Sequence, residues 1–223
     1  MAQKTGISAK NFYDTFGFGS YQTTWGWLQK LRSVMIRSGR ERLSGRVEVD
    51  ETYVGGQKEG KRGRGAACKV LVLVAVEGDS AKKLGRVRFR IVDSHARSNI
   101  KPFIEDFIEK GSTVVTDGLN SYDFLDKSDY KHEKYIMSGK NKKKDGESNL
   151  EHIHLVISLL KRWLLGTHQG SVTPEHMSGY LDEFAFRFNR RLSTHRGMLF
   201  YRLMQQAVTT RPKTIKGFYT QEG

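Results

Sequence analysis

Two aspartates, Asp50 and Asp117, are the residues of this sequence best placed for metal-dependent chemistry. Asp50 lies within Val47–Tyr53, an alternating segment, and Asp117 directly follows the apolar segment Ser112–Thr116. We expect both segments to be neighbouring strands of one sheet, which would bring the two carboxylates together. Paired carboxylates repel unless a cation neutralises them, so the pattern predicts a Mg²⁺ or Mn²⁺ site, with two ions about 4 Å apart as the usual arrangement. The simpler alternative is an exposed strand acid and an ordinary Asp-Gly turn.

A third metal ligand is expected from a helix predicted over residues 148–165. At about 100° per residue, Glu151, His154 and Lys161 fall on one polar stripe of that helix. Imidazole binds metals and moves protons at neutral pH, and a lysine two turns further along can hold a phosphate. We expect His154 as the ligand, with Glu151 as the alternative. A solvent-facing stripe without function is the competing interpretation.

The elements that must position these side chains follow from the hydrophobic periodicity. An alternating pattern predicts half-buried strands, and a continuous apolar run predicts a strand that is covered on both faces. We expect three strands in an antiparallel meander, then a helix, a strand, a short helix near Tyr122, a last strand and the helix over 148–165. This is the order of the ribonuclease-H-like fold, an α/β fold with a mixed five-stranded sheet flanked by helices. The expected strands are residues 47–53, 69–77, 86–93, 112–116 and 131–137.

The first 44 residues form a small all-helical segment in this interpretation. Ser8 can cap a helix that runs to Phe16, and a glycine-containing turn precedes a second helix over residues 21–37. The arrangement indicates a helix-turn-helix-like DNA-binding segment. Its polar side chains Gln22, Gln29 and Arg32 are candidate DNA contacts. We therefore expect a DNA-binding segment at 1–44, a catalytic domain at 45–195, and the end of the C-terminal helix with a tail at 196–223.

The charge distribution favours a nucleic-acid partner. The 223 residues carry a formal charge of +14, and yet residues 46–137 hold 17 basic and 15 acidic side chains. Basic segments on both sides of an acid-rich centre suit an enzyme that holds phosphates at its edges and metal in the middle. Lys142 and Lys143 lie in a glycine- and lysine-rich loop, and Arg187, Arg190 and Arg191 form a basic stretch; all five are candidate DNA contacts.

Cysteine usage and hydropathy narrow the class further. The single cysteine, Cys68, excludes an internal disulfide and a multi-cysteine zinc site. No apolar run approaches the roughly 20 residues of a membrane span, and no signal peptide opens the chain. We expect a cytoplasmic, nucleoid-associated protein that does not enter a membrane.

Four segments resemble one family, the ISXO-like insertion-sequence transposases of the DDE class. They are VEVDETYVGG at 47–56, VTDG at 115–118, LKRWLLGTH at 160–168 and YLDEFAFRFNRR at 180–191. The resemblance implies Asp50 and Asp117 as catalytic metal ligands and His154 at the third position, where relatives commonly carry Asn or Glu. It also implies Lys161 and Arg162 as DNA contacts. Relatives usually begin with a cysteine-based zinc ribbon, which one cysteine cannot form.

The resemblance to that family implies a bacterial enzyme that cuts and joins DNA. The expected activity is metal-dependent cleavage and strand transfer of an insertion sequence, hence DNA transposition and recombination. The partners would be double-stranded DNA, as terminal inverted repeats and target, and further copies of the chain assembled on it. The alternatives are a truncated, non-catalytic DNA-binding regulator of transposition and a ribonuclease-H-like nuclease without strand transfer.

Overall fold

The computed structural model describes most of the chain, in two compact units. The described residues are 5–37, 39–55, 69–79, 83–135, 150–169, 172–195, 197–211, 214 and 216–218. One unit, here the sheet unit, comprises Glu41–Val54 and Gly60–Lys161; the other, the helical unit, comprises Met1–Arg40, Gly55–Glu59 and Arg162–Gly223. The three-segment domain division expected from the sequence stays a prediction.

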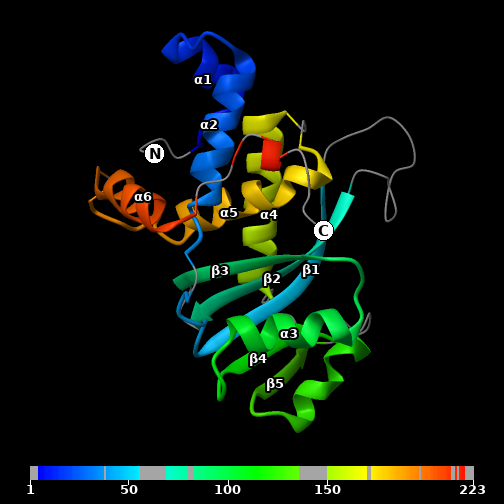
Figure 1. The fold of residues 1–223 in the computed structure, drawn as a ribbon. Coiled ribbons are helices and arrows are strands. Elements are labelled where there is room, and N and C mark those ends of the chain that lie inside the picture. Colours follow the sequence, from blue (N-terminus) through cyan, green and yellow to red (C-terminus); the bar gives the residue numbers. More distant parts are fainter. Residues whose placement is uncertain are drawn as a thin grey trace. The chain divides into compact units, whose positions relative to one another are not determined.

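The sheet unit is built on five strands in the order β3-β2-β1-β4-β5 (Figure 1). β2 and β3 are antiparallel, whereas β1 and β5 both run parallel to β4. Parallel neighbours need a crossover, which α3 (Arg97–Phe107) and the 3₁₀ helix η1 (Asn120–Lys127) provide. The mixed α/β sheet expected from the sequence is confirmed, and its arrangement is that of the ribonuclease-H-like fold. The strands are β1 (Arg46–Gly55), β2 (Lys69–Asp79), β3 (Lys83–Val92), β4 (Thr113–Asp117) and β5 (Lys131–Tyr135).

One face of the sheet is covered by α3 and η1. Val47 and Val49 of β1 pack there with Leu73 of β2 and with Phe103 and Tyr122 of the covering helices. All five side chains are fully buried. The two-residue spacing of the valines is therefore the inward-facing half of the alternation seen in the sequence.

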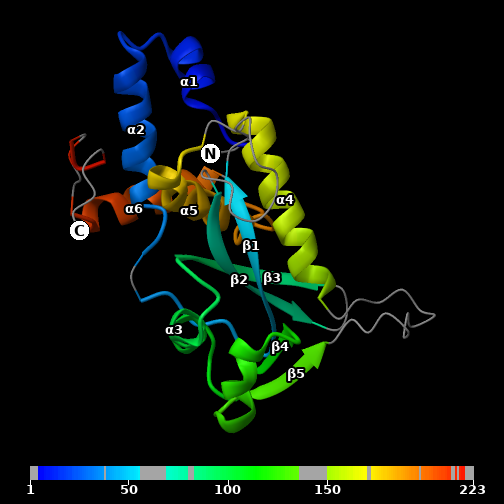
Figure 2. The same cartoon turned by 90° about the vertical axis from the view of Figure 1, so that its right-hand side faces the viewer.

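The opposite face is covered by the first half of α4 (Glu151–His168), as the two views together show (Figure 2). Ile153, Val156 and Leu160 of α4 are buried, at the spacing of one helical face. The continuous apolar run of β2 is buried on both of its faces, as expected for a strand covered on both sides.

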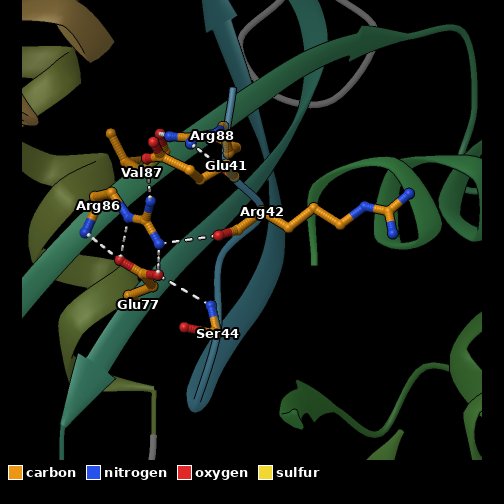
Figure 3. Close-up of polar contacts among 7 residues, drawn as sticks. All are labelled: Glu41, Arg42, Ser44, Glu77, Arg86, Val87 and Arg88. Carbon is orange, nitrogen blue, oxygen red and sulfur yellow. Dashed lines mark hydrogen bonds and ion pairs between the residues drawn. The ribbon is translucent and has the colours of Figure 1, made fainter. Parts of the chain in front are cut away.

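A half-buried ion pair ties the chain before β1 to the hairpin of β2 and β3 (Figure 3). Glu77 accepts hydrogen bonds from Arg86 Nε at 2.8 Å and from the Ser44 backbone N–H at 2.9 Å. Arg86 Nη2 also donates to the Arg42 carbonyl at 2.9 Å. Burial alone raises the pKa of the Glu77 carboxyl, but these hydrogen bonds outweigh it and hold the pKa below its usual value. Gly85 permits the approach, because a Cβ there would lie 2.5 Å from Glu77 Cβ.

The helical unit has a charged interior. Arg32, which is 2% exposed, donates through Nε to Glu183 Oε2 at 2.9 Å and lies 4.2 Å from the Tyr180 ring centre. Ser20 caps α2, and Gly17 ends α1 in the left-handed conformation with φ 64°. The helices of this unit are α1 (Ala9–Phe16), α2 (Tyr21–Ser33), the 3₁₀ helices η2 (Pro174–His176) and η3 (Lys216–Phe218), α5 (Met177–Phe188), α6 (Gly197–Thr209) and the end of α4.

Several boundaries differ from the sequence expectation, most clearly those of the helices. α4 continues through Gly166 to His168, because a glycine inside a helix costs only about 1 kcal/mol and tertiary packing overrides it. α2 ends at Ser33, four residues early, and residues 197–209 form a helix of their own. Within the described residues, no helix combines the length and apolar composition that crossing a membrane requires.

Candidate active site

Asp50 and Asp117 lie side by side at the centre of the sheet. The parallel register pairs Glu48 of β1 with Val115 of β4, so two residues further along Asp50 stands opposite Asp117, the last residue of β4. The prediction that their strands are neighbours is confirmed. β1 continues past the end of β4, so the two aspartates have no β4 residue beyond them. Both side chains are half-buried.

Glu51 joins the two aspartates in an acidic cluster. One carboxylate oxygen from each of Asp50, Glu51 and Asp117 lies within 4.8 Å of the others. Burial, followed by repulsion from Glu51 and Asp117, raises the pKa of Asp50 to about 6, even though the Glu51 N–H and His154 oppose the shift. Three oxygen donors at this spacing, with one carboxylate resisting ionisation, fit a hard divalent cation such as Mg²⁺ or Mn²⁺.

A network of hydrogen bonds holds Glu51 in place. The Tyr122 hydroxyl donates to Glu51 Oε2 at 2.8 Å, and His95 Nδ1 lies 3.2 Å from Oε1. The Tyr53 hydroxyl is 3.2 Å from the other ring nitrogen of His95. Burial and the adjacent acids keep the pKa of Tyr122 well above its usual value, so its hydroxyl stays protonated and donates.

Sequence reasoning missed Glu51 because alternation assigns it to the face opposite Asp50. The end of β4 is the feature that could have indicated Glu51. Asp117 is the last residue of β4, so Glu51 lies beyond the part of β1 that pairs with β4. Without a neighbouring β4 residue beside it, a glutamate side chain is long enough to reach the aspartates across the strand end.

α4 brings His154 against Asp50. His154 Nε2 lies 3.5 Å from Asp50 Oδ2, yet His154 is not part of the three-acid group. Glu151 is exposed at the start of the same helix. The choice between them as the third ligand stays a prediction.

Lys161 lies within electrostatic range of Asp50 and of a second lysine, Lys69. Burial and the Lys69 charge lower the pKa of Lys161, whereas Asp50 raises it. Lys69 is the first residue of β2 and is exposed; it is not among the residues predicted from the sequence. Lys161, with Lys69 near it, places positive charge close to Asp50 and suits a phosphate group.

The candidate DNA contacts fall into different environments. Gln22 and Arg162 are exposed, whereas Gln29 and Arg32 are 4% and 2% exposed, and Arg32 is bonded to Glu183. We therefore leave Gln29 and Arg32 out of the DNA surface proposed below. Lys142 and Lys143 lie outside the described residues.

The basic stretch at the end of α5 is held by its own helix. Arg187 donates through Nε to Glu183 Oε1 at 2.9 Å. The guanidinium groups of Arg190 and Arg191 each lie 4.0 Å from a ring centre, of Phe186 and Phe188 respectively. Arg190 and Arg191 remain half-buried, so part of each stays available to solvent.

The strand order and the paired aspartates define a class, the ribonuclease-H-like proteins with a cluster of carboxylates at the centre of the sheet. The chain belongs to one family within it: the model of the ISXO2-like transposase domain matches residues 42–189. It is also 28% identical over 181 residues to an uncharacterized protein in transposable element ISH50 of Halobacterium salinarum. That match covers 75% of this chain and 60% of the relative, so the chain spans less than two thirds of the relative's length.

Proposed function

We propose that this chain is a DDE-type transposase that cleaves DNA at the ends of an insertion sequence and joins them to target DNA. Membership of the transposase family supports the class of reaction. The observation that carries the proposal is the meeting of Asp50, Glu51 and Asp117 at the end of β4. Carboxylates so placed are costly without a cation, and a divalent cation is what phosphoryl transfer in this class requires.

Asp50 and Asp117 would hold the metal, with Glu51 as a further oxygen donor beside them. His154, next to Asp50, is the proposed third ligand from α4, and Glu151 stays the alternative. When bound, Mg²⁺ or Mn²⁺ lowers the pKa of the attacking hydroxyl and neutralises charge that develops on the phosphate. A pair of ions is the usual arrangement for this chemistry.

The protein's own side chains position the DNA in this proposal. Lys161 and Lys69 contact the phosphate beside the acidic cluster, by charge and hydrogen bonding. In the cleavage step a water oxygen attacks phosphorus in line and the bond from phosphorus to the 3′-oxygen breaks. The freed 3′-hydroxyl then attacks a phosphorus of the target DNA in the same geometry, and the bond from that phosphorus to the target's own 3′-oxygen breaks. No covalent enzyme intermediate is needed, because positioning and charge stabilisation supply the catalysis.

A second, basic surface lies in the helical unit and is proposed to bind the DNA backbone. Buried Met35, Phe186 and Leu203 pack together. An arginine lies within four residues of each of them along the chain: Arg37, Arg190 and Arg202 respectively. Burial, then the charges of Arg202 and Arg37, lowers the pKa of Arg190, so the three cations lie close together. Phosphates bound here would relieve that repulsion.

Cleavage of a duplex that carries the element's end tests the proposed activity. We expect nicking in Mg²⁺ or Mn²⁺ that is lost with a chelator and falls by at least about a hundredfold in Asp50→Asn and in Asp117→Asn. Asp129→Asn, which changes an exposed aspartate paired with Lys110, is the matched control and should cleave normally. Binding without cleavage in either metal would instead indicate the non-catalytic regulator.

A further inference from the structure

Glu48 is a buried carboxylate that lies two residues before Asp50 on β1. Its side chain is 2% exposed. Because alternate residues of a strand share a face, Glu48 and Asp50 both point toward the side that α4 covers. A carboxylate this deeply buried is costly unless its oxygens are hydrogen-bonded, so its partners indicate what it does.

Both partners of Glu48 lie in the first turn of α4. Oε1 is 2.8 Å from His152 Nδ1, and Oε2 accepts the Ile153 backbone N–H at 2.9 Å. Among the described residues, the first hydrogen bond along the helix is made by the next residue, His154, whose N–H donates to the Leu150 carbonyl at 3.2 Å. Glu48 therefore acts as a helix cap supplied by a strand, where a negative charge is also favoured by the helix dipole.

β2 leaves room for this contact. A Cβ at Gly78 would lie 2.7 Å from His152 Nδ1 and 3.1 Å from its Cγ. The β2–β3 pairing shifts register between Val76 and Gly78, so a glycine at a strand irregularity faces the imidazole. Any larger residue at position 78 would push His152 away from Glu48.

The contacts of Glu48 with His152 and Ile153, here called the clamp, set the position of the site residues on α4. Glu48 precedes Asp50 by two residues, and Ile153 precedes His154 by one. The hydrogen-bonded pair of Glu48 and Ile153 therefore lies directly beside the pair of Asp50 and His154, whose side chains are 3.5 Å apart. Sliding α4 by one residue would move His154 by 1.5 Å along its axis and 100° around it. Such a shift removes the imidazole from Asp50.

We propose that Glu48 is a positioning residue that fixes the start of α4 on β1 and so holds His154, and Lys161 two turns further on, at Asp50. The proposal rests on the proposed function for its catalytic consequence, but the clamp itself is measurable without cleavage. Groups that orient a metal ligand typically contribute ten- to a hundredfold to metal affinity or activity, and we expect an effect of about that size.

Glu48→Ala tests the clamp, with Glu77→Gln as the matched control. Glu77 is a half-buried carboxylate that also accepts a backbone N–H on this sheet, and its hydrogen-bond partners Ser44 and Arg86 lie outside α4. Hydrogen exchange on the whole protein should be at least about tenfold faster at Glu151–His154 in Glu48→Ala and unchanged there in Glu77→Gln. Equal exchange in Glu48→Ala and the wild type would overturn the proposal.

The His154 side-chain resonance gives a readout that a merely structural role would not move. In the wild type, Asp50→Asn should shift this resonance, because the two side chains meet; in the Glu48→Ala background the same change should leave it in place. An equal shift in both backgrounds contradicts positioning. Glu48→Gln keeps one oxygen acceptor for the Ile153 N–H, so it should restore part of the slow exchange. If Glu48→Ala does not fold, His152→Ala, which removes the other contact of Glu48 with α4, carries the same comparison.

The activity readout separates this proposal from the proposed function. Cleavage that is about tenfold slower in Glu48→Ala, with DNA affinity retained and Glu77→Gln near the wild-type rate, supports both. Absence of cleavage by the wild type would refute the proposed function and leave the exchange and resonance results to decide the clamp. Wild-type cleavage by Glu48→Ala would contradict positioning alone.

Discussion

Asp50 is an unfavourable residue in the folded protein unless a cation is bound. Its carboxylate is largely buried beside Glu51 and Asp117, and its pKa rises from 3.8 to about 6. The charged Asp50 carboxylate therefore lowers the stability of the fold, as is common where function requires a charge. The same residue therefore connects folding stability, pH and metal binding.

Replacing Asp50 should stabilise the metal-free protein at neutral pH. The folded pKa lies above the unfolded one, so the carboxylate destabilises the fold progressively as pH rises from about 4 to 6 and fully above that. Asp50→Asn keeps an oxygen to accept the Glu51 N–H and should gain about 3 kcal/mol at pH 7.5. Urea unfolding with a chelator at pH 4 and 7.5 measures this. A gain that is equal at both pH values would show that the charge is not its source.

Tyr122 should matter through Glu51. Tyr122→Phe removes the hydroxyl that donates to Glu51 Oε2 at 2.8 Å and should cost about 2 kcal/mol of stability, since the acceptor is charged and buried. Mn²⁺ affinity should fall by about tenfold. Tyr130→Phe, which removes a hydroxyl bonded to the Ile108 carbonyl, is the control. If both variants bound Mn²⁺ equally well, Glu51 would not contribute to the site.

At the scale of elements, the sequence predicted those parts of the fold that depend on periodicity. The valines of β1 and the apolar run of β2 placed two central strands correctly, and α4 appeared as an amphipathic helix. Burial of Gln29 and Arg32 was not predictable, because the partner of Arg32, Glu183, lies 151 residues away. Glu51 was missed for a related reason: strand alternation does not indicate where the neighbouring strand ends.

His168, the last residue of α4, should make the helical unit sensitive to acid. Burial and repulsion from Arg32 lower its pKa to about 4, although Glu183 opposes the shift. The folded pKa lies below the unfolded value of 6.5, so the stability that comes from neutral His168 is complete above pH 6.5 and is lost as pH falls toward 4. The loss from pH 7 to pH 5 should be about 2 kcal/mol.

His168→Phe isolates this contribution. It keeps a ring for the edge contacts with Trp163 and Tyr180 and removes the titrating group. Urea unfolding at pH 7 and 5 should show a smaller loss in the variant than in the wild type. The same loss in both proteins would assign the acid sensitivity to other groups.

For the whole molecule, the formal charge of +14 divides between two kinds of surface. The sheet unit holds the acidic cluster, and the helical unit holds the arginine group formed by Arg37, Arg190 and Arg202. A protein that binds metal in one unit and phosphate in the other needs both. Net charge alone indicates only a polyanionic partner.

The arginine group should contribute to DNA affinity without regard to sequence. Arg37→Gln combined with Arg202→Gln should weaken duplex binding at low salt and reduce the slope of log affinity against log salt by up to about 2. Lys110→Gln is the control for one lost charge, since Lys110 is exposed and lies in the sheet unit. An unchanged slope in the double variant would remove these arginines from the DNA surface.

A Mn²⁺ titration of the purified protein at pH 7.5 tests most directly whether Asp50 and Asp117 share a divalent cation. We expect saturable binding by the wild type, and affinities at least about tenfold weaker in Asp50→Asn and in Asp117→Asn than in the control Asp129→Asn. Binding should also weaken as pH falls through about 6, because the proton competes for Asp50. Equal affinity in all four proteins would show that the two aspartates do not form the metal site.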